Sequence, residues 1–534
     1  MESSRRWLYL FWVIAIGGFA GLHALHLSAD FPNHTPWFMD WAKYTDEGWY
    51  GNAAVRAHLF GNWYMKGDFN PAVALPVWPF LEWVLFWVTG VTIEAARGLA
   101  VAFFFVNLLL SYLLLRANGA RWTALLAVTL VVTSPFLYCF SRLAILEPLL
   151  TTLTLGALNL AVRLPRLRRP MWAAAGIGLL FALMMLTKTT AVFLLPALGW
   201  ALVLPLWDRK KLALCCAGAA AGVAAALFGT WMALVTGFGL WPDYKYLFFV
   251  NKYDKPPEYY WPLLSFWWSF HGGLWIDHVL IPLAGMIFLG ALVLWRSGFG
   301  RRLLLDPLFG ASVLAVCGYI AFMTIQNHPQ PRYYAVVGFF SFFVVAQGAG
   351  ALVGAEGQAG ATAAKSVPWM RWAGRAVIAA AAVTAIFNGV DTVNFATHPE
   401  YTFVNAAERL THYIDEHPNG KRLLVSISGD QITMVSHLPT LCDDFGTQDL
   451  ASKLAAYQPG WYATWNDLDP GTLEDLHNRF SVEQVTSFPA FDDPGRNMLV
   501  LFKLHPLPGG EVRDPVEKTL QVPLPGDKID IPVE

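Results

Sequence analysis

Two adjacent carboxylates, Asp46 and Glu47, follow the first hydrophobic segment of the chain, with Tyr50 close behind them. Acidic residues beside a bilayer are costly to desolvate, so by default they mark a functional site. The alternative is a pair of solvated loop acids without a shared role. A carboxylate held near a reacting carbon can act as a general base toward a hydroxyl or an amine. Asp46 and Glu47 are therefore candidate catalytic residues.

Further charged residues stand at the ends of hydrophobic segments, on the side of the membrane where the charge pattern places this pair. One short connection holds Arg142 and Glu147, Lys188 stands between two spans, and Arg332 begins a later span. Each has an ordinary explanation. Arg142 and Glu147 could neutralise each other, Lys188 could extend to the headgroup level, and Arg332 could bind lipid headgroups nonspecifically. Together, cations that face carboxylates suit a substrate with an anionic lipid phosphate, which arginine binds in a forked geometry.

The elements that position these residues are hydrophobic helices. The chain of 534 residues is 56% hydrophobic and 14% charged, against roughly 25% charged residues in a soluble domain. Apolar runs of about 17 to 25 residues recur, the length needed to cross about 30 Å of hydrocarbon. The predicted fold is a polytopic α-helical membrane protein with about eleven spans. These lie near residues 7–27, 97–115, 123–140, 147–163, 171–187, 190–206, 211–235, 278–295, 303–325, 333–352 and 374–391.

Arginine and lysine residues in alternate connections predict the orientation, because basic loops stay in the cytoplasm. The N-terminus, with Arg5 and Arg6, lies on the same side as these loops, and the first span lacks a cleavage site and reads as an anchor. An odd number of spans then places the residues after 392 outside the cytoplasm. A formal net charge of −1 gives no reason to expect a nucleic-acid partner. The basic residues of the loops are Arg116, Arg121, Arg163, Arg166, Arg168, Arg169, Arg209, Lys210, Lys211, Arg296, Arg301, Arg302, Lys365, Arg371 and Arg375.

Residues 73–90 are apolar enough to span, but counting them would invert every basic loop that follows. Glu82, two prolines and three tryptophans in this segment favour an interfacial or re-entrant helix. We therefore place it within a large first external loop, residues 28–96, of a transmembrane domain that covers residues 1–392.

Hydropathy drops after Asn394, and the pattern changes to that of a small α/β domain over residues 393–505. Helical periodicity at 402–416 precedes strand-like runs that alternate with helical patterns. The domain lacks a G-x-G-x-x-G fingerprint after its first strand, and residues 506–534 read as an extended tail. The predicted strands are 422–427, 461–465, 482–487 and 498–504, and the further predicted helices are 447–456 and 471–479.

The order of these motifs resembles that of the GT-C glycosyltransferases, and in particular the bacterial protein-mannosyltransferase-like and aminoarabinose-transferase-like group of glycosyltransferase family 39. The resemblance covers residues 7 to 350 and implies a GT-C fold in a bacterial-type inner (plasma) membrane. In this family the aspartate of the first-loop Asp-Glu pair is the usual catalytic candidate, so the resemblance implies this role for Asp46, with Glu47 beside it. Glu147 matches the acid of the second external loop. The resemblance also carries over to Lys188, to the Arg332-Tyr333 segment, and to the aromatic pair Tyr259-Tyr260. The motif elements are Asp46-Glu47 with Tyr50, Arg97, Ser141-Arg142-x4-Glu147-Pro148 and Leu186-Thr187-Lys188.

Two departures from the family pattern bear on specificity. Many relatives carry Lys-Pro-Pro in the first loop, where this chain has Asn70-Pro71-Ala72-Val73-Ala74-Leu75-Pro76, so one cation facing the phosphate or the sugar is missing. Glu147 stands where aspartate is more common, which extends its reach by one methylene. Transfer of the sugar specificity of lipid A modifying relatives is therefore not implied.

The function we expect is transfer of a sugar from a polyprenyl-phosphate donor to a lipid, glycan or protein acceptor at the external membrane face. A transporter or flippase for lipid-linked or anionic solutes is the alternative, and a structural scaffold is a third possibility. A divalent metal held by Asp46, Glu47 or His271 stays possible without support from the residue spacing. The predicted site comprises catalytic Asp46, Glu47 and Glu147, donor-phosphate ligands Arg97, Arg142, Lys188, Arg332 and Tyr333, and cleft residues Tyr50, Tyr259, Tyr260, His271 and His328.

Overall fold

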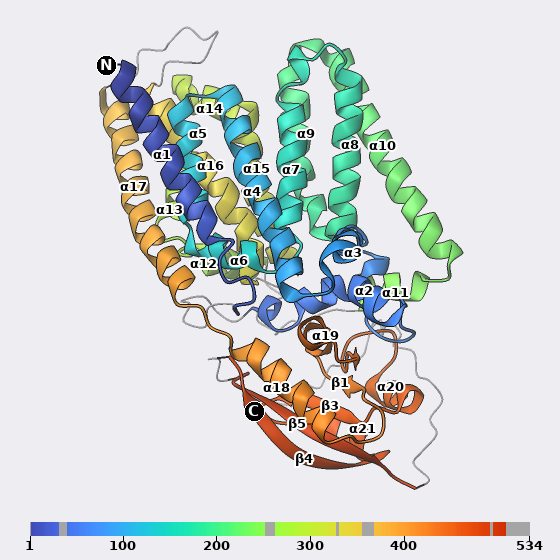
Figure 1. Cartoon of the computed structure of the whole chain (residues 1–534). Coiled ribbons are helices and arrows are strands. Elements are labelled where there is room, and N and C mark those ends of the chain that lie inside the picture. Colours follow the sequence, from blue (N-terminus) through green and yellow to red (C-terminus); the bar gives the residue numbers. More distant parts are fainter. Residues whose placement is uncertain are drawn as a thin grey trace.

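A bundle of long helices stands on a smaller domain that contains a β-sheet (Figure 1). The computed structural model describes residues 2–30, 40–250, 262–326, 330–354, 368–491 and 495–508. The N-terminus lies at the end of the bundle far from the sheet, and short helices fill the junction between the two parts. The charged residues predicted to form the site stand at the helix ends that face this junction.

Most helices of the bundle coincide with predicted spans, with the pair α5–α6 standing for residues 123–140, whereas α12 and α14 correspond to none of them. Its helices are α1 (Glu2–Leu22), α4 (Ile93–Asn118), α5 (Arg121–Thr133), α6 (Pro135–Arg142), α7 (Glu147–Ala161), α8 (Pro170–Thr187), α9 (Leu195–Val203), α10 (Lys210–Gly237), α12 (Pro262–Gly273), α13 (Leu280–Val293), α14 (Phe299–Leu304), α15 (Pro307–Gln326), α16 (Tyr334–Val353) and α17 (Pro368–Thr397).

Six helical stretches within the described residues are long and apolar enough to cross a membrane, or seven if the bent pair α5–α6 forms one span. One of the six, Thr189–Gly237, contains both α9 and α10, which the sequence predicts as separate spans. Shorter apolar helices add Arg6–Leu22, Val77–Thr89 and Leu280–Arg296. Several apolar spans are thus present, and the total of eleven stays a prediction.

The bend between α5 and α6 measures 68° and follows from two adjacent residues. Pro135 stands in the first turn of α6, where its ring interrupts the hydrogen-bond ladder that would join the helices. The Ser134 hydroxyl restarts the ladder, because it accepts a hydrogen bond from the Leu137 backbone nitrogen at 3.0 Å. The bend turns Arg142, at the end of α6, toward the junction.

Helix α16 forms the centre of the bundle. The most apolar part of the stretch Pro331–Val353, which contains this helix, is 78% buried within the protein, whereas that of Thr189–Gly237 is 17% buried. Helices α5, α13, α15 and α17 all contact α16. Arg332, directly before α16, therefore enters the junction from the middle of the bundle.

The first loop folds into two helices at the junction, α2 (Asp46–Phe60) and α3 (Val77–Thr89) (Figure 1). Helix α3 has 13 residues, which gives a length of about 20 Å, less than the roughly 30 Å hydrocarbon core. This length agrees with the expectation that residues 73–90 do not span. A short helix, α11 (Trp241–Lys245), lies beside them.

The sheet domain has five strands in the order β2-β1-β3-β5-β4. Strand β1 pairs in parallel with β2 and β3, whereas β5 is antiparallel to both β3 and β4. The strands are β1 (Leu424–Val425), β2 (Thr440–Leu441), β3 (Trp461–Trp465), β4 (Phe480–Pro489) and β5 (Met498–Pro506), and the helices are α18 (Thr402–Glu416), α19 (Gly429–Ser436), α20 (Leu450–Tyr457) and α21 (Pro470–His477).

Alternating side chains of the strands feed two separate apolar clusters. Trp461 packs in a cluster with residues of α18 and α19, and its neighbour Tyr462 packs in another with residues of α20 and α21. This is the period of two expected where both faces of a sheet are covered. The predicted strands overlap β1, β3, β4 and β5, whereas β2 and α19 were not predicted.

Candidate functional site

Four of the predicted site residues come together at helix ends on the junction side of the bundle. Asp46 and Glu147 are the first residues of α2 and α7, where the helix dipole favours a negative charge. Lys188 directly follows α8, and Arg332 lies in the turn Pro331–Tyr333 before α16. We call Asp46, Glu147, Lys188 and Arg332, with the neighbouring Asp40, the junction cluster.

Arg332 is the centre of this cluster. Its Nη1 donates to Asp40 Oδ1 at 2.7 Å, and its backbone nitrogen donates to Asp40 Oδ2 at 2.8 Å. Its Nη2 forms an ion pair with Asp46 Oδ2 at 3.1 Å. One guanidinium therefore joins two carboxylates that come from opposite ends of the same short segment.

Lys188 and Glu147 form the second ion pair of the cluster, through Nζ and Oε1. The Tyr333 ring contacts both cations, with Lys188 Nζ 4.7 Å and the Arg332 guanidinium carbon 5.0 Å from its centroid. Cations are attracted to the negative face of an aromatic ring at such distances. Tyr333 therefore helps to hold two like charges in one place.

The cluster is closed to solvent, and three of its polar atoms lack a hydrogen bond. Asp46 is 1%, Glu147 2% and Arg332 3% exposed. Asp46 Oδ2, Glu147 Oε2 and Arg332 Nε have no hydrogen-bond partner, although the first takes part in the ion pair with Arg332. Buried polar atoms left without partners are rare in folded proteins and call for an explanation. A substrate that supplies one acceptor and two donors is the explanation that the chemistry of these atoms favours.

The electrostatics of the cluster act most clearly on Asp46. Burial raises the pKa of the Asp46 carboxyl above its usual value, the Arg332 charge lowers it, and the Asp40 charge raises it again. A carboxylate with a raised pKa is a better proton acceptor near neutral pH. Burial also raises the pKa of Tyr50, with the Asp46 charge as the next cause, so Tyr50 lies beside the cluster.

Glu47 belongs to a different arrangement from its neighbour Asp46. Both of its carboxylate oxygens accept from Arg97, from Nε and Nη2 at 2.7 Å each, and the Ala144 nitrogen donates to Oε1 at 2.8 Å. The remaining donor of Arg97, Nη1, bonds the carbonyl oxygens of Leu27 and Ala29. This forked pair ties α2, α4 and the loop before α7 together, and each of the three guanidinium nitrogens of Arg97 donates to a group within the protein.

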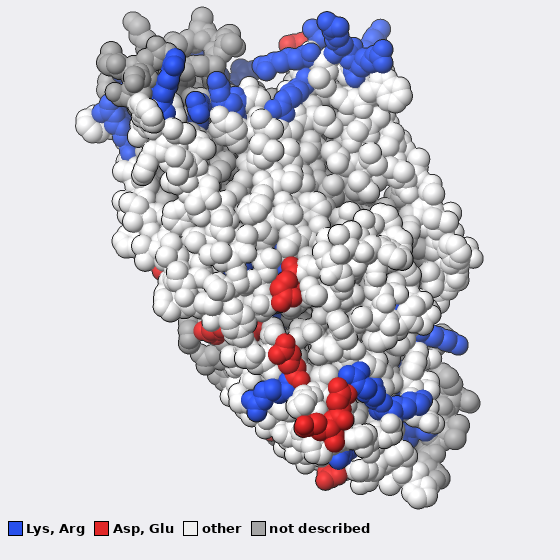
Figure 2. All heavy atoms as spheres, viewed as in Figure 1, with Lys and Arg blue, Asp and Glu red and all other residues white. Residues whose placement is uncertain are grey.

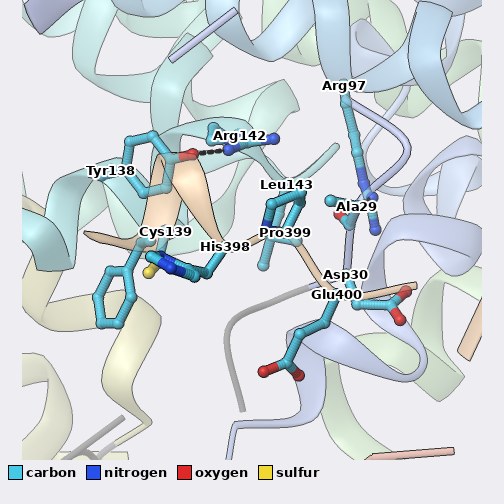
Figure 3. A pocket seen from close by; sticks show the side chains of 11 residues that line it. Ala29, Asp30, Arg97, Tyr138, Cys139, Arg142, Leu143, His398, Pro399 and Glu400 are labelled. Atoms are coloured by element: carbon cyan, nitrogen blue, oxygen red, sulfur yellow. Dashed lines mark hydrogen bonds between the residues drawn. The ribbon is translucent and has the colours of Figure 1, made fainter. Parts of the chain in front are cut away.

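Arg142 also bonds within the protein. It donates to the carbonyl oxygens of Leu25, at 2.7 Å, and His26, and to the Tyr138 hydroxyl. Figure 3 shows Arg142 and Arg97 on the wall of a small pocket, with the carboxylates of Asp30 and Glu400 below them. Neither Asp46 nor Lys188 lines this pocket. The structure therefore divides the predicted phosphate ligands into two groups, of which only Lys188, Arg332 and Tyr333 join the junction cluster.

Of the other predicted cleft residues, only His271 lies within the part of the chain that the structure describes. His271 is exposed on α12, where its ring contacts Trp267. Tyr259, Tyr260 and His328 lie outside the described residues. Among the described residues no group of three or more His, Cys, Asp or Glu side chains could hold a metal ion.

Asp40 is a member of the cluster that the sequence reading did not include. It is 3% exposed and is joined to the cluster by Arg332, a residue 292 positions later in the chain. The one sequence signal was a second acid, Asp40, shortly before Asp46 in a segment with several tryptophans.

Comparisons with known proteins agree with this architecture. Residues 71–233 match the family described as dolichyl-phosphate-mannose-protein mannosyltransferase. The crystal structure of ArnT from Cupriavidus metallidurans in the apo state superposes with a TM-score of 0.57 at 15% identity, over 93% of this chain and 98% of ArnT. ArnT bound to undecaprenyl phosphate gives a TM-score of 0.59 at 14% identity, over 92% and 98% of the two chains. No curated protein sequence matches the chain.

At these identities the ArnT structures establish the fold, and the family match over residues 71–233 adds sequence evidence for part of the bundle. The helices α2 and α3 of the junction, the bundle and the sheet domain all lie within one shared architecture. The chain is therefore similar to ArnT in fold over most of its length, and it is similar in sequence to the dolichyl-phosphate-mannose-protein mannosyltransferase family over residues 71–233.

Proposed function

We propose that this protein transfers a sugar from a polyprenyl-phosphate donor to a hydroxyl or amine of an acceptor at the external face of the membrane. The observation that carries the proposal is the buried junction cluster, in which Asp46 shares Arg332 with Asp40 and lies near the Lys188–Glu147 pair. The family match and the undecaprenyl phosphate bound to ArnT support the class of donor.

The donor phosphate occupies the side of Arg332 that carries Nε and Nη2. Arg332 Nε is a buried donor without a partner, and the nearby Lys188 adds a second positive charge. A phosphate in this position replaces Asp46 at Nη2, so donor binding releases the Asp46 carboxylate from its ion pair. Preorganised cations that face the leaving phosphate stabilise the charge that develops there during transfer.

Asp46 then serves as the general base. The acceptor oxygen or nitrogen forms a bond to the anomeric carbon of the sugar, while the bond between that carbon and the phosphate oxygen breaks. The bonding electrons leave with the polyprenyl phosphate, and the proton of the acceptor passes to Asp46. Glu147 Oε2, a buried acceptor without a partner, binds a hydroxyl of the sugar or of the acceptor.

Glu47 and Arg97 support this chemistry by holding the start of α2. Their forked pair satisfies both partners within the protein, which fits a structural role better than contact with substrate. In the same way Arg142 fixes the end of α1 through the carbonyl groups of Leu25 and His26.

The charge distribution supports the proposed orientation. Figure 2 shows lysine and arginine gathered at the end of the bundle opposite the sheet domain, with a broad uncharged belt between the two ends. Basic loops stay in the cytoplasm. The proposed topology therefore has about eleven spans, a cytoplasmic N-terminus, and an external face that carries the junction cluster, the α/β domain of residues 393–505 and the tail.

A transporter or flippase would place its charged site near the bilayer midplane, on helices interrupted there. The junction cluster lies instead where helices end, next to the sheet domain. Its position favours chemistry at one membrane face over passage through the bundle.

The proposal is tested by incubating the purified protein in detergent with a small panel of polyprenyl-phosphate sugars. We expect time-dependent consumption of one donor with release of the polyprenyl phosphate. Movement of a donor across the bilayer of reconstituted vesicles, without cleavage of its sugar-phosphate bond, would support the flippase instead.

A further inference from the structure

The sheet domain contacts the helix that carries Asp46. Helix α19 packs against α2 (Figure 1), and the approach is closest at Gly48. A Cβ atom built on Gly48 would lie 2.2 Å from the backbone nitrogen of Gln431, so only glycine fits at this position. The backbone of the sheet domain therefore touches α2 one turn or less from Asp46.

A buried charge network holds the two helices together. Arg56 of α2 contacts Asp430 of α19 at 2.9 Å and Asp68 at 2.6 Å, and Lys453 of α20 contacts Asp68 at 3.1 Å. Asn52 of α2 donates to Asp430 at 2.9 Å. The side chains of the four charged residues are at most 4% exposed and sum to zero charge. Breaking one such buried pair leaves an uncompensated charge, so this contact is strongly held.

Gln431 continues the contact to the start of α2. Its Nε2 donates to Glu47 Oε2 and to the Lys43 carbonyl oxygen, at 3.2 Å each. Lys43 ends the short helix Trp41–Lys43, which lies between Asp40 and Asp46. A side chain of the sheet domain thus bonds on both sides of Asp46, to Lys43 before it and to Glu47 after it.

We infer that the sheet domain is part of the catalytic scaffold, and that Gln431 is a positioning residue that holds Asp46 through Glu47 and Lys43. This inference rests on the proposed function, because it assigns Asp46 to the reacting centre. The sheet domain contacts neither Lys188 nor Arg332 in the contacts described above, so its effect should fall on turnover and not on binding of the donor.

Two variants test the inference. Gln431→Met keeps the length of the side chain but removes both hydrogen bonds, and Gly48→Ala forces α19 away from α2. We expect each to lower kcat by about tenfold to a hundredfold, because a small displacement of a reacting group has effects of this order. The donor KM should stay within about twofold of the wild-type value.

Ser436→Ala is the matched control. Ser436 lies on the same helix, α19, and its hydroxyl accepts a hydrogen bond from Thr411 of α18, inside the sheet domain. We expect wild-type kcat for this variant. Loss of kcat equal to that of Gln431→Met would indicate general damage to the domain and overturn the inference, as would wild-type kcat in both test variants.

Backbone hydrogen exchange over residues 43–50 separates this inference from the proposed function. Gln431→Met should speed exchange in this segment, whereas Ser436→Ala should not. Faster exchange in a protein that consumes no donor would retain the positioning role and contradict the glycosyltransferase. Unchanged exchange in Gln431→Met would contradict the positioning role whatever the activity.

Discussion

Arg332 binds Asp40 and Asp46 at once, with Nη1 on one carboxylate and Nη2 on the other, at 2.7 and 3.1 Å. The contact to Asp40 is reinforced by the backbone nitrogen of Arg332, whereas the contact to Asp46 is a single ion pair. Asp40 therefore fixes the guanidinium, and Asp46 is the partner that a phosphate can replace. This asymmetry underlies the proposed exchange between base and donor.

The two neighbours of Asp46 predict opposite shifts in the pH dependence of turnover. Arg332 lowers the pKa of Asp46, and Asp40 raises it. Because the base works in its ionised form, activity falls as the pH drops through this pKa. In the free enzyme, which the kcat/KM profile for the donor reports, Arg332→Gln should move the acid limb to higher pH by about one unit or more, and Asp40→Asn should move it to lower pH.

The measurement is kcat/KM against pH, at donor concentrations below KM, for the wild type and both variants. Arg332→Gln should also weaken donor binding about tenfold or more, because it removes a charge-assisted contact. Acid limbs that coincide in all three proteins would show that Asp46 is not the group that titrates.

Variants of the Lys188–Glu147 pair distinguish its contribution to protein stability from its contribution to donor binding. Lys188→Met leaves Glu147 charged and buried, which should reduce the free energy of unfolding by about 3–5 kcal/mol. The double variant Lys188→Met with Glu147→Gln should regain most of this stability but stay impaired in donor binding. Thermal unfolding and donor titration together check both expectations.

An exposed ion pair supplies the comparison for this prediction. Arg422 and Asp415 of the sheet domain are 46% exposed, so Arg422→Met should cost at most about 1 kcal/mol. For the buried pair, wild-type donor affinity in the double variant Lys188→Met with Glu147→Gln would show that Lys188 only neutralises Glu147.

Glu47 and Arg97 should behave as a structural pair. Glu47→Gln and Arg97→Gln should each reduce the free energy of unfolding by about 3–5 kcal/mol and so lower the melting temperature. The double variant should lose less stability than the sum of the two single variants. Donor affinity of the folded fraction should not change. An Arg97→Gln protein that melts normally but binds donor weakly would restore Arg97 as a phosphate ligand, as predicted from the sequence.

Much of the fold follows from local patterns in the sequence. The apolar runs and the helical period at 402–416 predict helices that the structure contains. A helix with one buried face repeats its apolar residues at the helical period, and a helix that crosses a membrane is a continuous apolar run. Strand β2 and helix α19 were missed, and for β2 the reason is that its two residues are ordered by pairing with β1, which depends on the rest of the sheet.

The site was predictable only in part. Asp46, Glu147, Lys188 and Arg332 stand out because charges at the ends of apolar segments are costly. The different partners of Asp46 and Glu47 could not be predicted from the sequence. These adjacent residues of α2 point in different directions, and their partners, Arg332 and Arg97, lie far apart in the chain. Asp40, Gln431 and the Arg56–Asp430 contact likewise depend on tertiary structure alone.

The orientation of the bundle is open to a direct test. An alkaline-phosphatase reporter fused after Glu400 should be active, and one fused near Arg168 inactive, because basic loops stay in the cytoplasm. The reverse pattern would place the junction cluster on the cytoplasmic side and contradict an external reaction.

The role of Asp46 is the central claim, and one comparison tests it most directly. Release of polyprenyl phosphate from the preferred donor should be measured for the wild type, for Asp46→Asn and for the neighbouring Glu47→Gln, at equal amounts of folded protein. We expect Asp46→Asn to lose about 10² to 10⁴ in kcat, as loss of a positioned base does, while its melting temperature and donor affinity stay at or above wild-type values. Turnover by Asp46→Asn within a few-fold of the wild type would contradict the account.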